Sequence, residues 1–280
     1  MLFKFYFFNL RKPLSLIFVF KVFCYYNKKF LYVLYKNTNF FSLTQYFVDK
    51  MYPLCYYNIV LKRLNKAVLF LGTSIKKIDF NGELCYQLDC SDFSALFCPG
   101  IGANMLRLQD TKNNYEILHF DEKISNEKLK QDICLYGIPT LYLPNRFHKG
   151  ILKASDNTYN LPINEPDFNN FIHGFLHQRA FRVTNTLCDE AFCSITAEFD
   201  YNENDEFYKY YPLDFKAAIT YTLSNSGLEY VFKIKNLSKN MLPVIAGNHT
   251  AINLPFSKAT KEEDLRIKAN IFEKLTLNDS

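Results

Sequence analysis

FKAAITYTLSNSGLEYVFKIK, residues 215–235, decides the fold class of this chain. On both sides of the segment SNSG at residues 224–227, every second residue is apolar. A period of two places these apolar side chains on one face of a β-strand. Ser, Asn and Gly favour tight turns, so the stretch predicts a β-hairpin with one buried face.

The same alternation continues outward from this hairpin through residues 71–280. It recurs at residues 193–199, and weaker strands are predicted at residues 76–80, 84–90, 95–97 and 105–109. Residues 126–132 fit a short helix. Many short strands between polar turns favour an all-β fold, a large antiparallel β-sandwich.

The 280 residues divide into two compositions near Leu71. Residues 1–70 carry eleven Lys and Arg, one acid and 21 Phe and Tyr, a net charge of +10. Residues 71–280 carry 22 basic and 27 acidic residues, a net charge of −5. We therefore predict an atypical aromatic and basic extension, 1–70, and a β-sandwich domain, 71–280. The acidic balance of the domain gives no reason to expect nucleic acid as a partner.

The most apolar run, LSLIFVFKVFCYY at residues 14–26, is short for a membrane span and contains Lys21. Membrane association is therefore not expected, although the basic residues before the run leave an N-terminal signal or anchor as an alternative. The eight Cys are scattered, with no C-x-x-C pair and no zinc-ligand spacing. These features predict reduced, mostly buried thiols, a cytoplasmic location and no metal.

Three polar motifs interrupt the strands. They are PNRFHKG with Arg146, FIHGFLH with His173, and GNHTAINLPF with His249. Taken alone, Arg146 is typical of a surface residue and each histidine is typical of a structural one. His177 follows His173 at a spacing that can bind zinc on a helix, but Gly174 lies inside the motif, so a metal site is not predicted.

Together with YNLPINEP at residues 159–166, the three motifs resemble, in order and wording, those of the aldose 1-epimerase (galactose mutarotase) family. The resemblance covers roughly residues 74–257, with its best match from Leu143 to His177. It implies a mutarotase-like supersandwich, incomplete at the C-terminus.

The resemblance also implies a reaction, the interconversion of the α and β anomers of a hexose of the glucose or galactose type. His249 would be the general acid at the ring oxygen, and His173 would hydrogen-bond the sugar. Arg146 and Asn145 would bind its hydroxyl groups. No cofactor is implied.

One departure from the family concerns the general base, which in the family is a glutamate in a late segment. Only 31 residues follow His249 here, and none of their carboxylates lies in a matching motif. We therefore expect the base beyond Ser280, and impaired activity in a chain that ends there. The alternative is a non-catalytic carbohydrate-binding module on the same fold.

Overall fold

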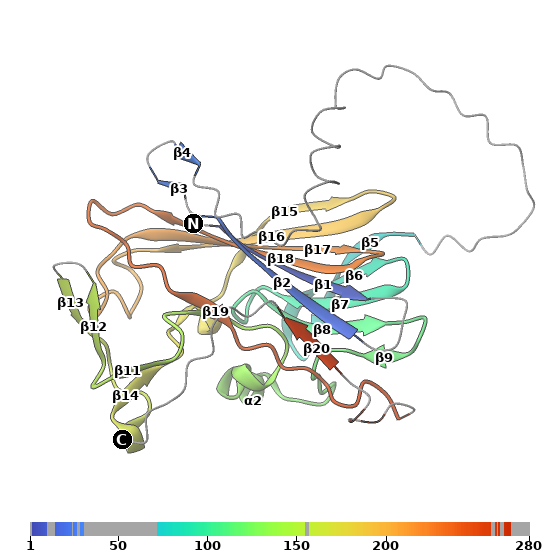
Figure 1. Cartoon of the computed structure of the whole chain (residues 1–280), viewed down its shortest axis with the longest axis horizontal. Helices are drawn as coiled ribbons and strands as arrows, with labels where there is room; N and C mark the ends of the chain where they lie inside the picture. Colours follow the sequence, from blue (N-terminus) through green and yellow to red (C-terminus); the bar gives the residue numbers. More distant parts are fainter. Residues whose placement is uncertain are drawn as a thin grey trace, which may run out of the picture. The chain divides into compact units, whose positions relative to one another are not determined.

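The computed structural model describes residues 72–154, 157–258, 261 and 263, and the backbone alone of residues 2–9, 15–23, 25–26, 29–30 and 266–269 (Figure 1). The chain forms two compact units, Met1–Val22 with Leu71–Ser280, and Phe23–Phe70. In the second unit the described strands β3 (Tyr25–Tyr26) and β4 (Lys29–Phe30) pair with each other. The first unit contains both large sheets.

A five-stranded antiparallel sheet follows the order of the chain. Its strands are β5 (Ser74–Phe80), β6 (Glu83–Cys90), β7 (Phe93–Cys98), β8 (Asn104–Asp110) and β9 (Tyr115–Glu116). Its turns contain residues with positive φ, among them Asn81 and Gly82, which suit the tight reversals between neighbouring strands. The weaker strands predicted from the sequence fall in this sheet.

A seven-stranded sheet has the order β15-β16-β17-β18-β1-β2-β20. Its strands are β1 (Leu2–Asn9), β2 (Ser15–Phe23), β15 (Arg182–Cys188), β16 (Phe192–Tyr201), β17 (Phe215–Ser224), β18 (Gly227–Asn236) and β20 (Arg266–Ala269). The hairpin of β17 and β18 closes at the pair Ser224–Gly227, and buried residues alternate along β17. The hairpin predicted at residues 215–235 is confirmed.

The two sheets pack face to face, with β16 and β17 against β6 and β7. Phe97 of β7 and Tyr221 of β17 meet in the interface, with 5.7 Å between their ring centroids. One continuous core joins the inner faces of both sheets, including Leu88, Ile195 and Phe232. This sheet-on-sheet packing confirms the predicted all-β sandwich.

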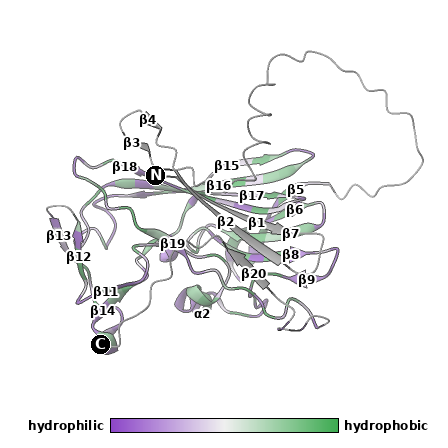
Figure 2. Ribbon diagram, viewed as in Figure 1, coloured by the Kyte–Doolittle hydropathy of each residue, from purple (hydrophilic) through white to green (hydrophobic). Residues whose placement is uncertain are grey.

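Smaller elements carry the polar motifs. Three two-stranded pairs are β10 (Thr140–Tyr142) with β19 (Ala246–Asn248), β11 (Arg146–His148) with β14 (Asn170–Ile172), and β12 (Ile151–Ala154) with β13 (Asn157–Asn160). In the hairpin of β12 and β13, strand β13 is hydrophilic (Figure 2). The helical turns are α2 (Asn126–Gln131), η1 (Ile133–Leu135), η2 (Pro166–Phe168) and η3 (Leu176–Gln178). The Ser125 side chain caps α2, which confirms the short helix predicted there.

The described part of residues 1–70 differs from the sequence-based expectation of an extension separate from the sandwich. Its sequence shows no strand period, yet the backbones of β1 and β2 are strands of the seven-stranded sheet. Residues 31–70 lie outside the described part of the chain. β1 pairs antiparallel with β18, from Leu2 opposite Lys233 to Tyr6 opposite Glu229. Backbone pairing needs no alternation of side chains, and Phe and Tyr favour strands. The division of the chain at residue 71 stays a prediction.

The prediction of reduced thiols is wrong for one pair of cysteines. Cys188 and Cys193 lie directly opposite each other at the ends of β15 and β16 and form a disulfide. A spacing of five residues does not by itself indicate a disulfide. The two cysteines lie opposite each other because a tight hairpin joins β15 and β16. The thiols of Cys85, Cys90, Cys98 and Cys134 are free.

No helix among the residues described is both long and apolar enough to cross a membrane.

Candidate active site

Two of the polar motifs lie side by side because β11 pairs with β14. Arg146 is opposite Ile172 in this pair. One residue further along, the backbone N–H of His173 donates to the carbonyl oxygen of Asn145 at 3.1 Å. The pairing therefore sets Asn145 and Arg146 beside His173.

The third motif joins them through β10 and β19. Tyr142 is opposite Ala246, and the backbone N–H of His249 donates to the carbonyl oxygen of Pro139 at 3.2 Å. β10 leads through residues 143–145 directly into β11. One continuous segment therefore contacts both histidine motifs.

The two predicted histidines meet edge to face. The ring centroids of His173 and His249 are 5.5 Å apart, with an angle of 72° between the ring planes. His249 is exposed and His173 is half-buried. Two imidazoles from segments 76 positions apart in the sequence are thus placed within the span of one sugar ring.

The backbone around His173 adopts conformations that non-glycine residues rarely take. Leu143, Asn145 and His173 have φ values of 67°, 63° and 67°. Each such residue costs on the order of 1–3 kcal/mol and persists where the surroundings hold it in place. Gly174 follows with φ 71°, and a Cβ there would lie 1.6 Å from the carbonyl oxygen of Tyr142. Only glycine fits at that position, which explains the H-G pair physically.

Arg146 is bound by a carboxylate, Glu165, for which no role was predicted from the sequence. Its Nε donates to Oε2 of Glu165 at 2.8 Å and its Nη2 donates to Oε1 at 2.7 Å. Asn170 Nδ2 also donates to Oε2 of Glu165 at 2.8 Å. The signal that could have identified Glu165 is its place in the YNLPINEP motif.

The electrostatic surroundings favour an uncharged His173. Burial lowers its pKa, and the positive charges of His249 and Arg146 lower it further, against the opposing effect of Glu165. Its Nδ1 is buried and makes no hydrogen bond within the described part of the chain. At neutral pH this ring is therefore neutral, and one ring nitrogen can donate while the other accepts.

His177 lies in η3 and is buried, with 5% of its surface exposed. Burial lowers its pKa to about 4, with smaller effects from His173 and Arg179. Over the residues that the structure describes, no group of three His, Cys, Asp or Glu side chains is arranged to hold a metal ion.

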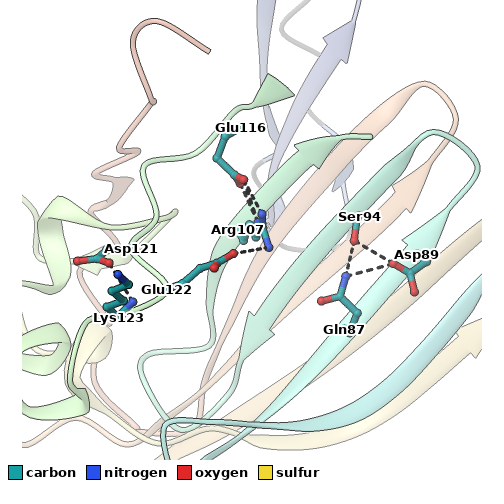
Figure 3. A network of polar contacts seen from close by, with 8 residues as sticks. All are labelled: Gln87, Asp89, Ser94, Arg107, Glu116, Asp121, Glu122 and Lys123. Atoms are coloured by element: carbon teal, nitrogen blue, oxygen red, sulfur yellow. Dashed lines mark hydrogen bonds and ion pairs between the residues drawn. The ribbon is translucent and has the colours of Figure 1, made fainter. Parts of the chain in front are cut away.

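A second polar network supports the segment that follows His249 (Figure 3). Arg107 of β8 binds Glu116 of β9 at 2.8 Å and Glu122 at 3.3 Å. Residues 116–119 in turn pair with residues 251–256, through bonds such as that from the His119 N–H to the Ala251 carbonyl oxygen at 2.9 Å. The five-stranded sheet thus fixes the chain on the C-terminal side of His249. Gln87, Asp89 and Ser94, also drawn in Figure 3, form a separate cluster across β6 and β7.

Known proteins resemble this chain in sequence and in fold. A family model described as aldose 1-epimerase matches residues 85–279. A solved galactose mutarotase-like protein from Clostridium acetobutylicum is 32% identical, with a TM-score of 0.66, over 68% of this chain and 57% of that one. A galactose 1-epimerase from Lactobacillus acidophilus, 19% identical with a TM-score of 0.51 over 66% of this chain and 54% of that one, shares the fold. The chain therefore spans little more than half the length of these solved proteins.

Proposed function

Because the chain belongs to the aldose 1-epimerase family, we propose that it interconverts the α and β anomers of a hexose by opening and closing the sugar ring. The observation that carries the proposal is the meeting of His173 and His249, with 5.5 Å between their ring centroids. Ring opening needs a proton placed on the ring oxygen and a proton removed from the C1 hydroxyl group. Histidine is the side chain best suited to move protons near neutral pH.

His249 is proposed as the general acid at the ring oxygen. Its side chain is exposed, so it can reach a bound sugar and exchange protons with water. Its backbone is fixed by the bond to Pro139 and by the pairing of the following residues with residues 116–119. A positioned acid of this kind contributes roughly 10²–10⁴-fold to rate.

His173 is proposed to bind the sugar rather than to transfer the proton. Burial and two positive neighbours hold its pKa below the usual range, so it is a neutral hydrogen-bonding group at neutral pH. Arg146, at the start of β11, and Asn145, whose carbonyl oxygen accepts from the N–H of His173, are proposed to bind hydroxyl groups of the sugar. Both side chains present N–H donors, which suit hydroxyl oxygens.

The general base is not assigned to a described residue. Glu165 is the carboxylate beside Arg146, and both of its oxygens are engaged by Arg146 and Asn170. The prediction that the base comes from a segment beyond Ser280, with impaired activity in its absence, stays a prediction. The identity of the hexose and the cytoplasmic location likewise stay proposals.

Polarimetry of freshly dissolved α-D-glucose and α-D-galactose tests the proposed function. The chain should accelerate the drift to the anomeric equilibrium above the rate in buffer, and His249→Ala should lower that acceleration about 10²-fold or more. His119→Ala is the matched control, because His119 is exposed and stacks on Tyr136 rather than on His173. Sugar binding by ligand-observed NMR without any acceleration would instead support the carbohydrate-binding alternative.

A further inference from the structure

Arg146 and Glu165 are unequally exposed. The side chain of Arg146 is 51% exposed and that of Glu165 is 18% exposed. The carboxylate is thus the partner fixed by the protein, and the guanidinium is the partner that faces solvent. An ion pair between two fully exposed side chains would fix the position of neither side chain.

A short loop holds Glu165 in place. Glu165 and Asn170 exchange backbone hydrogen bonds at 3.0 and 3.1 Å across the turn of η2. Asn170, 7% exposed, adds a side-chain bond from Nδ2 to Oε2 of Glu165 at 2.8 Å. The carboxylate is therefore oriented by backbone and side chain together.

The same loop is joined to the strand that leads into His173. The side chain of Asn164 donates to the carbonyl oxygen of Ile172 at 2.9 Å and accepts from its N–H at 2.7 Å. The side-chain amide of Asn164 thus makes the two hydrogen bonds with Ile172 that the backbone of a neighbouring strand would make. The loop, β14 and β11 thus form one fixed unit, from Glu165 through Ile172 to Arg146.

Glu165 contacts one edge of the guanidinium, the edge formed by Nε and Nη2. Nη1 makes no hydrogen bond in the part of the chain that is described, so its two N–H groups are available to a ligand. A free arginine side chain carries about 2 kcal/mol of rotamer entropy, which binding would otherwise have to overcome. When Glu165 fixes the guanidinium group of Arg146 before the ligand binds, the entropic cost of binding is lower. The carboxylate of Glu165 also neutralises the positive charge of Arg146.

We propose that Glu165, oriented by Asn170, is a positioning residue that fixes Arg146 so that its outward N–H groups bind hydroxyl groups of an uncharged sugar. This inference rests on the proposed function. It assigns no chemical step to Glu165, because the carboxylate acts through Arg146. Its loss should therefore weaken sugar binding more than it slows turnover.

The test uses the full chain and measures KM and kcat by polarimetry, with the dissociation constant for α-D-galactose by ligand-observed NMR. Glu165→Gln should raise KM and the dissociation constant about tenfold and change kcat less than about threefold. Arg146→Ala should give a similar rise. Since Glu165 acts only through Arg146, the double variant should be no worse than Arg146→Ala. Asp167→Asn, an exposed carboxylate of the same loop, is the matched control and should match the wild type.

Two failures are distinguishable. If the wild-type chain neither binds nor interconverts either sugar, the proposed function is wrong, and the role of Glu165 in sugar binding is overturned with it. If the wild-type chain binds sugar and Glu165→Gln keeps the same KM and dissociation constant, the function stands and the positioning role is overturned. Additive losses in the double variant would also overturn it, because Glu165 would then act independently of Arg146.

Discussion

At the scale of single residues, Gly174 is the position where backbone geometry constrains the site most directly. Gly174→Ala would place a Cβ 1.6 Å from the carbonyl oxygen of Tyr142, at a φ of 71°. Because backbone cannot yield as a flexible side chain can, we expect a loss of at least about 2 kcal/mol in the free energy of unfolding. Urea denaturation measures this loss.

Gly247→Ala is the matched control for Gly174→Ala. Gly247 lies in β19, two residues before His249, and a Cβ there would meet Pro144 at an ordinary 3.6 Å. We expect its free energy of unfolding to change by less than about 1 kcal/mol. Equal losses in the two variants would show that the close approach of Tyr142 does not constrain Gly174.

His177 gives the fold a dependence on pH. Its pKa is lowered from 6.5 to about 4 by burial, so the unfolded chain binds the proton more tightly than the folded chain. The stabilisation is therefore present above pH 6.5 and is lost as the pH falls toward 4, by up to about 3 kcal/mol. The lowered pKa of His173 acts in the same direction.

The measurement is urea denaturation at several pH values between 7 and 4. His177→Gln removes the titrating group, so stability should fall less steeply with decreasing pH, whatever its absolute value. His148→Gln, at an exposed position, should keep the wild-type slope. A slope unchanged by His177→Gln would mean that His177 is not the group responsible.

At the scale of elements, the disulfide joins the ends of β15 and β16. Closing a loop of six residues stabilises a fold by about 2 kcal/mol in the chain-entropy model. Reductant should therefore lower the thermal unfolding midpoint of the wild-type chain. Cys188→Ser should start at the lower midpoint and not respond to reductant, since Cys188 is exposed and the substitution leaves the core intact.

Cys134→Ser is the control for the disulfide. Cys134 is a free, half-buried cysteine, so this variant should keep the full response to reductant. Titration of thiols in denaturant gives an independent count. If eight thiols react without reductant, the original prediction of reduced cysteines is right for Cys188 and Cys193 after all.

The elements that could be predicted from the sequence are those whose residue pattern lies within one short stretch of the chain. Residues 215–235 combine a strict period of two with a turn, so the hairpin of β17 and β18 could be predicted with its register. The opposition of Cys188 and Cys193 and the pairing of Arg146 with Glu165 depend on how strands and loops meet. Neither pairing follows from local pattern, and β1 lacks even the alternation that marks a strand.

For the candidate site too, local sequence motifs could be recognised, whereas contacts between distant segments could not be predicted. Arg146, His173 and His249 could be named because each lies in a motif whose wording resembles a known family. Their meeting depends on the pairs β11–β14 and β10–β19, which consist of three-residue strands too short to be predicted from a pattern.

At the scale of the whole chain, the two compositions do not coincide with the two large sheets. The family match covers residues 85–279, and most strands of both sheets fall inside it. β1 and β2, from the basic and aromatic extension, nevertheless lie in the seven-stranded sheet between β18 and β20. These two strands of the extension therefore take part in the sheet that the remaining residues were predicted to form alone.

The pairing of β1 with β18 predicts a specific consequence of removing residues 1–70. β18 bonds to β17 on one side and to β1 on the other, so the deletion leaves one edge of β18 unpaired. We expect the sandwich core of residues 86–242 to unfold cooperatively still, because the buried residues that the structure describes in this core lie outside the deletion. The exposed edge should promote association between chains, as unpaired strand edges do.

Hydrogen exchange followed by mass spectrometry measures this directly. Peptides that cover β18 should exchange faster in the deleted chain than in the full one, because the N–H groups that face β1 lose their acceptors. Peptides that cover β16, which keeps β15 and β17 on its two sides, are the internal control and should not change. Light scattering should rise with concentration for the deleted chain alone. Equal exchange in β18 before and after the deletion would mean that β1 does not protect that edge in solution, and the sequence-based separation of residues 1–70 from the sandwich would then be the better description.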